Sequence, residues 1–305
     1  MFEVFDRAKG HQAELWAATQ DGRVLALLLP VRITLKQGLL RYFTSRAIAY
    51  GGVLSAPGSE GEEALKILLD TYVHEVSGDI LFTELRNRTD VRAIRFVLQH
   101  AKFRFEQEYN FLVELALPVE DMWRNISKST QKKIRRTRER GDVAIEELRE
   151  REMLPVWYGL IQETYSRVHV PLADYSLFES AFDTLYPQGK IRFLLVRGQD
   201  RYIAGSVALL HKAAIYDWYR GFDLEYGRMH PNDAMVWHML EWGAENGYRV
   251  FDFGGAGKPD QDYGPRTFKS RFGGTLVNYG RCICIHAPVK LKLSQVGYQV
   301  LRRVL

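Results

Sequence analysis

The sequence predicts a mixed α/β protein built from two halves that repeat one order of elements. Each half shows strand signals, then an amphipathic helix, then a short apolar strand. The composition of the 305 residues, with 46% hydrophobic, 26% charged and 12% aromatic residues, is ordinary for a globular protein and excludes disordered, collagen-like and coiled-coil chains. These observations predict α/β (α+β) architecture with mixed sheets in two tandem domains.

The first half opens on a hairpin. Two strand-like runs, 14–19 and 24–34, flank Asp21-Gly22, the dipeptide that most readily supplies the positive φ angles of a tight turn. Residues 60–75 then place apolar side chains at helical spacing, and 79–85 follow as a β-rich run. The first half is therefore expected to fold as strands, helix and strand.

The second half repeats this order. Its strands are expected at 191–196, 203–210 and 213–219, followed by a helix over 231–246 and a buried strand over 249–253. Residue identity between the halves is slight, so the repetition indicates a duplication of element order.

One helix is expected over 119–140, because Pro118 stands just before its first turn, where a missing N–H costs nothing. We place the domain boundary there. Residues 1–118 form the N-terminal domain, and residues 119–305 form the C-terminal domain, which the helix leads into.

The second part of this helix concentrates positive charge. Residues 128–140 contain seven basic side chains and the single acid Glu139, a net charge of +6, whereas the whole chain carries +5. A block of one sign repels itself and is best kept where phosphates or other anions neutralise it. A solvated helix face is the alternative. The anion-binding candidates are Lys128, Lys132, Lys133, Arg135 and Arg136.

Residues 287–305 predict a terminal helix with Val289, Leu293, Val296, Val300 and Val304 at helical spacing, several basic residues and no acid. We expect it to dock on the protein, with packing back on the N-terminal domain as one option. Peripheral contact with an anionic membrane surface is the alternative.

The compartment is expected to be the cytoplasm, with the inner face of the membrane as a second option. The only cysteines, Cys282 and Cys284, are not expected to bridge each other. The N-terminus lacks the basic region of a signal peptide, and no apolar run approaches the roughly 20 residues of a spanning helix.

The densest cluster of unusual residues lies between 251 and 274. Asp252 and Gly254-Gly255 end the predicted buried strand, and Phe268-Lys269 belong to a short basic-aromatic turn before a second glycine pair. Glycine directly after a buried strand lets a ligand approach the backbone closely, at the edge where α/β sheets bind ligands. Two purely structural turns remain the alternative.

These residues carry a family resemblance. The run 252–255, and Phe268-Lys269 before 271–274, resemble the C-terminal signature of the FemAB-type aminoacyltransferases within the GNAT acyltransferase superfamily. Trp123 and the basic helix fit the same pattern. The resemblance implies two GNAT-like domains and transfer of an amino acid from aminoacyl-tRNA to an amine of a peptidoglycan or other cell-envelope precursor. The long helical arm of the staphylococcal enzymes has no counterpart here.

The resemblance also implies roles for residues. Lys269 would stabilise the oxyanion and the leaving oxygen when an amine attacks the tRNA-linked ester. Asp252 would orient the acceptor amine or cap the loop, and Phe268 would pack and position rather than react. The implied substrate-binding residues are Tyr216, Trp218, Tyr219, Arg220, Gly254, Gly255, Tyr263 and Arg271. The implied tRNA-binding residues are the five anion-binding candidates named above.

Strand alternation places Tyr216, Trp218 and Arg220 on one face and Tyr219 on the other, so that one set can line a cleft. Arg220 is expected to contact a phosphate or carboxylate, for example on a nucleotide- or lipid-linked precursor.

The donor is the least determined part of this interpretation. A conventional GNAT domain binds the coenzyme A pyrophosphate with a Gly-rich loop at a helix N-terminus, but the segment 226–234 offers only Gly227, and Pro231 removes a donor. Aminoacyl-tRNA is therefore the expected co-substrate, and no bound cofactor is expected. An acyl-CoA-dependent N-acyltransferase of surface polysaccharide biosynthesis and a non-catalytic tRNA- or precursor-binding module stay open.

Other chemistries have little support in the sequence. The eight histidines show no metal-ligand spacing with cysteine or carboxylate, so no metal site is expected. The chain contains neither a P-loop nor a GxSxG elbow.

Overall fold

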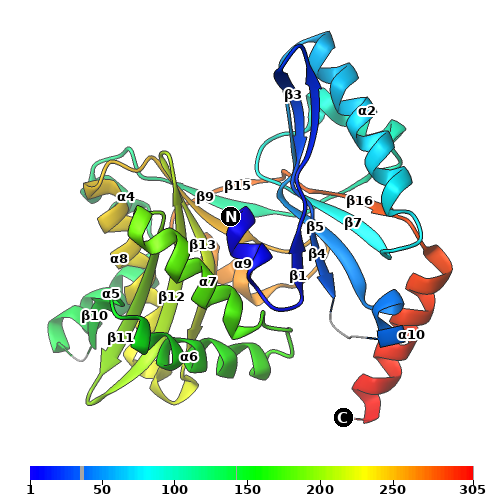
Figure 1. Cartoon of the computed structure of the whole chain (residues 1–305). Helices are drawn as coiled ribbons and strands as arrows, with labels where there is room; N and C mark the ends of the chain where they lie inside the picture. The colour runs from blue at the N-terminus through cyan, green and yellow to red at the C-terminus, as the bar shows by residue number, and fades with distance from the viewer. Residues whose placement is uncertain (35–37, 142, 305) are drawn as a thin grey trace. The chain divides into compact units, whose positions relative to one another are not determined.

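The computed structural model describes residues 1–34, 38–141 and 143–304, with the backbone alone at 39–40 and 298–304. The chain forms two compact units (Figure 1). Unit 1 contains Met1–Glu108 and Asn278–Leu305, and unit 2 contains Tyr109–Val277.

Over its described residues, unit 1 has a six-stranded mixed sheet and a three-stranded sheet. The larger sheet has the order β1 (His11–Ala13), β4 (Val31–Thr34), β5 (Ser45–Gly51), β7 (Phe82–Asn87), β16 (Arg281–Ile285) and β8 (Arg104–Glu106). The smaller sheet contains β2 (Trp16–Gln20), β3 (Arg23–Leu28) and β6 (Val53–Ser55). The helices are α1 (Phe2–Asp6), η1 (Gly38–Phe43), α2 (Ser59–Val76), η2 (Arg92–Ile94), α3 (Arg95–His100) and α10 (Pro288–Val304).

The predicted hairpin at Asp21-Gly22 joins β2 to β3, and both turn residues have positive φ. The single strand expected over 24–34 is wrong, because the chain breaks at Pro30, which cannot donate to a strand ladder, and continues as β4 in the other sheet. The helix α2 buries Leu65, Leu68, Leu69 and Tyr72 in the core of the unit.

In the part that the structure describes, unit 2 has one seven-stranded sheet. Its order is β10 (Val143–Glu147), β11 (Ile191–Gly198), β12 (Arg201–His211), β13 (Ala214–Phe222), β14 (Val250–Gly255), β9 (Asn110–Glu114) and β15 (Thr275–Val277). The α-helices are α4 (Val119–Asn125), α5 (Lys128–Arg140), α6 (Leu154–Arg167), α7 (Tyr175–Leu185), α8 (Pro231–Glu245) and α9 (Gly264–Ser270). The 3₁₀ helices are η3 (Arg151–Met153), η4 (Tyr186–Gln188) and η5 (Leu224–Met229).

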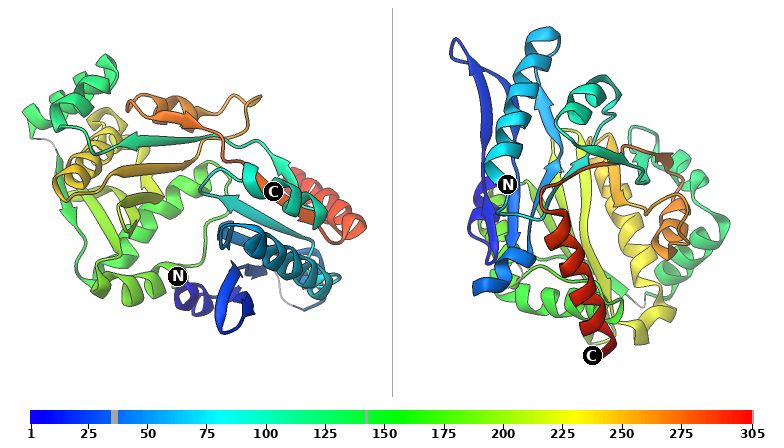
Figure 2. Two further views of the ribbon diagram at one scale, coloured as in Figure 1. Left: turned by 90° about the horizontal axis from the view of Figure 1, so that it is seen from above. Right: turned by 90° about the vertical axis from the view of Figure 1, so that its right-hand side faces the viewer.

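Helices cover both faces of this sheet. Figures 1 and 2 show α6 and α7 on one face and α5 and α8 on the other. The strand β13 runs parallel to β14, and α8 connects them. In unit 1, β5 runs parallel to β7, and α2 lies between them in the chain. The strand, helix and parallel strand of the predicted repetition thus occur in both units.

Unit 2 begins at Tyr109, before the expected boundary at 118/119. The chain returns to unit 1 after residue 277. The reason is strand pairing. The strand β9 pairs with β14 and β15, so residues 110–114 belong to unit 2. The strand β16 pairs with β7 and β8, so the C-terminal segment belongs to unit 1.

The single helix expected over 119–140 is also wrong. The helix α4 ends at Asn125, and α5 starts after Ser127, whose Oγ accepts a hydrogen bond from the Thr130 N–H at 3.3 Å as an N-cap. The side-chain amide of Gln131 donates to the carbonyl oxygens of Trp123 (2.7 Å) and Ile126 (2.9 Å), so the end of α4 keeps its partners.

Candidate functional site

The site begins where β13 and β14 separate. The last paired residues of these described strands are Tyr216 and Asp252, although β13 runs on to Phe222 and β14 to Gly255. The register of β14 against β9 also shifts between Asp252 and Gly255. Backbone groups that leave a ladder in a protein interior need other partners. We call this opening, from Tyr216 and Asp252 onward, the strand split.

Lys269 supplies those partners. Its ammonium, on α9, donates to the carbonyl oxygens of Phe253 (2.7 Å), Gly255 (2.7 Å) and Gly254 (3.3 Å). The residue is only 8% exposed. A buried ammonium is tolerated where its N–H groups are hydrogen-bonded, and three carbonyls match its three donors. The structure thus places a fixed positive charge at the strand split, held by the end of β14.

Asp252 shapes the same strand end. Its Oδ1 accepts hydrogen bonds from the side-chain amide of Asn110 (2.6 Å) and from the backbone N–H of Gly254 (2.7 Å). Gly254 has a φ of 69°, a conformation that glycine adopts without strain. Of the two roles considered for Asp252, these contacts match the capping of the loop.

Arg220 lies on the β13 side of the split. Its Nη2 donates to Asp217 Oδ2 at 2.8 Å, and its guanidinium lies 5.1 Å from the ring of Phe268 and 5.8 Å from that of Phe253. Its Nη1 is buried and has no hydrogen-bond partner among the described residues. A partly buried guanidinium with an unpartnered Nη1 suits a carboxylate or phosphate group, and Phe268 packs against it.

The expected alternation along β13 is wrong after Asp217. The register against β12 shifts so that Asp217 pairs with Ala208 and Tyr219 with Val207, which leaves Trp218 as the extra residue of a β-bulge. The rings of Trp218 and Tyr219 both contact Phe178 of α7, at 5.8 and 4.8 Å between centroids. These two aromatic residues therefore pack against α7.

Sequence reasoning missed Tyr165 and Asp217. The ring of Tyr165, on α6, lies 5.6 Å from that of Tyr219. Burial and the nearby Asp217 carboxylate raise the pKa of Tyr165 to about 12, and Tyr263 adds to this effect. Gly221 allows α6 to approach, since a Cβ there would lie 2.7 Å from the Leu160 carbonyl oxygen. No local signal marks Tyr165, whereas Asp217 stands three residues from Arg220 in the predicted strand.

A second polar cluster occupies the N-terminus of α8. Asp233, in the first turn, is 6% exposed, and its Oδ1 lies 3.8 Å from the ammonium of Lys133 on α5. Arg271 also contributes positive charge at this carboxylate. A helix N-terminus attracts anions, and here the chain's own carboxylate is already in place. Lys133 and Arg271 therefore act on Asp233.

The pKa of Asp233 leads to a prediction about stability. Burial raises it above the ordinary value of 3.8, and Lys133, His230 and Arg271 oppose the rise. The folded protein therefore binds this proton more tightly than the unfolded chain, and this group's contribution to stability falls as pH rises from about 3.8 through the raised value. We expect Asp233→Asn to raise the Tm at pH 7 and to lose this advantage towards pH 4.

Thermal unfolding between pH 4 and 8 measures this effect, with the exposed Asp200→Asn as the baseline. A lower Tm for Asp233→Asn at pH 7 would mean that the pair with Lys133 outweighs the cost of burying the carboxylate.

The basic side chains of α5 fall into two groups, those that contact other parts of the protein and those that are exposed. Lys133 pairs with Asp233, Arg138 pairs with Glu241 at 2.5 Å, and the guanidinium of Arg135 lies 5.4 Å from the Trp123 ring. Three further basic side chains are exposed and make no ion pair or hydrogen bond with the described residues; they are Lys128, Lys132 and Arg136. Four-residue spacing puts these three on one stripe of the helix, which we call the basic stripe.

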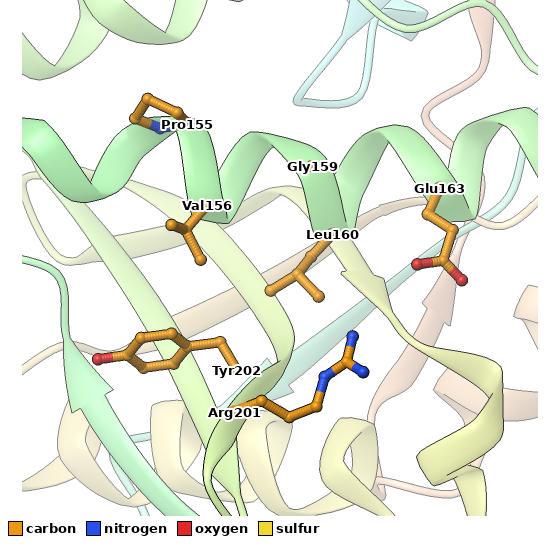
Figure 3. A pocket seen from close by; sticks show the side chains of 7 residues that line it. All are labelled: Pro155, Val156, Gly159, Leu160, Glu163, Arg201 and Tyr202. Carbon is orange, nitrogen blue, oxygen red and sulfur yellow. The ribbon is translucent and has the colours of Figure 1, made fainter.

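A separate hollow of about 460 Å³ lies against α6 (Figure 3). Its lining residues are Pro155, Val156, Gly159, Leu160, Glu163, Arg201 and Tyr202. No sequence-predicted site residue lines it. Over the described residues, no three His, Cys, Asp or Glu side chains gather as metal ligands, and no helix has the length and apolarity needed to cross a membrane.

Comparison with known proteins agrees with this architecture. Residues 124–269 match the family model of the acetyltransferase (GNAT) domain. The structure of FemX is similar with a TM-score of 0.71 and 16% identity, over 96% of this chain and 92% of that chain. A search of curated proteins found no match.

Two further structures have the same fold. The C-terminal domain (DUF2156) of a putative lysylphosphatidylglycerol synthetase from Agrobacterium fabrum has a TM-score of 0.60 at 17% identity, over 98% of this chain and 91% of that one. A tandem GNAT protein from the clavulanic acid biosynthesis pathway has 0.53 at 10%, over 92% and 84%. The predicted fold class is confirmed as a tandem, mixed α/β GNAT acyltransferase fold. Membership of the FemAB family stays a prediction.

Proposed function

We propose that the protein is an aminoacyltransferase that passes an amino acid from aminoacyl-tRNA to an amine of a peptidoglycan or other cell-envelope precursor. The observation that supports this donor most directly is the N-terminus of α8. A coenzyme A pyrophosphate would bring two phosphates to a helix end that already holds the buried Asp233 carboxylate. The likeness to FemX and to a lysylphosphatidylglycerol synthetase domain points in the same direction.

The reaction needs no covalent enzyme intermediate. The neutral acceptor amine attacks the carbonyl carbon of the aminoacyl ester, a C–N bond forms, and the C–O bond to the ribose breaks. The amine loses a proton, and the departing ribose oxygen gains one. Negative charge develops first on the carbonyl oxygen and then on the ribose oxygen, so a fixed cation nearby lowers the barrier.

Lys269 is the proposed source of that positive charge. Its hydrogen bond to the Gly254 carbonyl is the longest of the three at 3.3 Å. This N–H can therefore leave the carbonyl and donate to a developing oxyanion at the smallest cost in free energy. Arg220 would bind an anionic group of the precursor through its unused Nη1, with Asp217 holding the guanidinium in place. Asp252 would keep the end of β14 in position.

An acyl-CoA-dependent N-acyltransferase is the second candidate, and the match of residues 124–269 to the acetyltransferase (GNAT) domain favours it. The two candidates share the strand split and Lys269, and they differ in the donor.

Thermal unfolding in the presence of each donor separates the candidates. We expect aminoacyl-tRNA to raise the Tm, because a ligand at 100 times its Kd adds about 2.7 kcal/mol to the stability of the state that binds it. Coenzyme A and acetyl-CoA are expected to leave the Tm unchanged up to millimolar concentration. Uncharged tRNA is the control for contacts outside the aminoacyl group. Stabilisation by micromolar coenzyme A without any by tRNA would overturn the proposal and favour the second candidate.

A further inference from the structure

The C-terminal helix α10 turns its apolar stripe away from the protein. The described side chains of Val289, Leu293 and Val296 are 73%, 57% and 51% exposed. Their spacing of four and three residues places them on one face of the helix. The helix docks on unit 1 as expected, but it does not do so through this stripe.

Another side of α10 attaches it to unit 1. Ser294 Oγ donates to the Phe43 carbonyl oxygen at 2.6 Å, and the Lys290 ammonium donates to the Gly78 carbonyl oxygen at 3.2 Å. The same ammonium lies 5.5 Å from the centre of the Tyr42 ring. Figure 1 shows α10, drawn in red, beside the segment that contains η1. Polar contacts thus hold the helix to the protein, while its apolar stripe remains uncovered.

The charge of α10 indicates what covers the stripe. Residues 288–304 include Lys290, Lys292, Arg302 and Arg303 and not one acidic residue. A helix with an apolar face whose charged residues are all basic is typical of segments that lie in the interface of an anionic membrane. Two copies of α10 packed through this stripe would bring like charges together, which disfavours a dimer.

We propose that α10 is a membrane-surface helix that inserts Val289, Leu293 and Val296 among the headgroups of an anionic lipid bilayer and brings the exposed Lys292 to the lipid phosphates. The inference goes beyond the proposed function and does not depend on the donor. If the acceptor is lipid-linked, the helix brings the enzyme to the surface where that acceptor resides.

Co-sedimentation of the full chain with lipid vesicles tests this inference. We expect the protein to bind vesicles of phosphatidylcholine with 30% phosphatidylglycerol and to bind pure phosphatidylcholine vesicles at least tenfold more weakly. The double variant Leu293→Ser/Val296→Ser should lose at least tenfold in affinity for the anionic vesicles. Lys292→Gln should weaken that binding by a smaller factor.

Phe96→Ser is the matched control, because Phe96 is 80% exposed on α3 of the same unit. It is expected to bind vesicles like the parent, and unchanged circular dichroism and Tm check that every variant is folded. Equal affinity for neutral and anionic vesicles, or no binding at millimolar lipid, would overturn the inference. So would a dimer of the parent in light scattering that the double variant abolishes, since the occupant would then be a second copy. Parent-like stabilisation of the double variant by aminoacyl-tRNA would show that the donor site is separate.

Discussion

Replacing Lys269 with methionine is expected to lower the rate of aminoacyl transfer by about 100-fold or more, the range found when one preorganised donor to an oxyanion is removed. The same change leaves the carbonyls of Phe253, Gly254 and Gly255 without their charged partner. We expect it to cost about 3 kcal/mol of stability, since unsatisfied buried acceptors are expensive. Activity and stability must therefore be measured together, by initial rates of transfer from charged tRNA and by urea unfolding.

Arg266 provides the matched control on the same helix. Its guanidinium donates to the carbonyl oxygens of Ala256 (2.8 Å) and Pro259 (3.2 Å), and also to that of Lys258. Arg266→Met should thus lose a comparable set of contacts to the loop after β14, but the rate should fall by less than about tenfold, because this cation does not lie at the strand split. Lys269→Arg keeps the charge and should recover part of the rate.

The alternative outcome is equally clear. If Lys269→Met and Arg266→Met lose activity in the same proportion to stability, Lys269 is a structural residue that holds the end of β14. The proposed charge stabilisation would then have to come from another group.

The sequence predicted the helices and strands better than it predicted which strands pair with each other. The turn at Asp21-Gly22, the helix α2 and the strands β11 to β14 follow from local signals that each segment carries within itself. The break between α4 and α5 was also readable in principle, because Ser127 is a good N-cap residue. The positions of β9 and β16 in their sheets could not be predicted, because a strand of five residues carries no signal that identifies a pairing partner far away in the sequence.

The sequence named the residues of the candidate site, but it could not give their geometry. The motif identified Lys269, yet its carbonyl partners lie 14 to 16 residues away and depend on how α9 folds back onto β14. Asp217 and Arg220 would point to opposite faces of a regular strand, and the β-bulge at Trp218 brings them together. Lys133 and Asp233, which pair between two helices, are 100 positions apart in the sequence.

Those pairings change what the basic helix is expected to do with tRNA. Affinity should fall with salt with a log–log slope near −2, because the basic stripe offers three contacts and each contributes roughly 0.7 for single-stranded or folded RNA. Lys133 is engaged with Asp233 and Arg138 with Glu241, so neither adds to the slope. The double variant Lys132→Gln/Arg136→Gln should flatten the slope by about 1.4 and weaken binding about tenfold or more at 0.1 M salt.

Arg138→Gln is the matched control, since it removes an exposed charge from the same helix outside the stripe. Its slope should stay close to that of the parent, because a guanidinium that already pairs with a carboxylate releases few counterions when RNA binds. Titrations of tRNA at four salt concentrations between 50 and 400 mM distinguish the two variants. Equal flattening by both would mean that the whole helix acts as a diffuse positive field. If the affinity for tRNA is independent of salt, or if tRNA does not bind, α5 is only a solvated helix face. Acyl-CoA would then be the preferred donor.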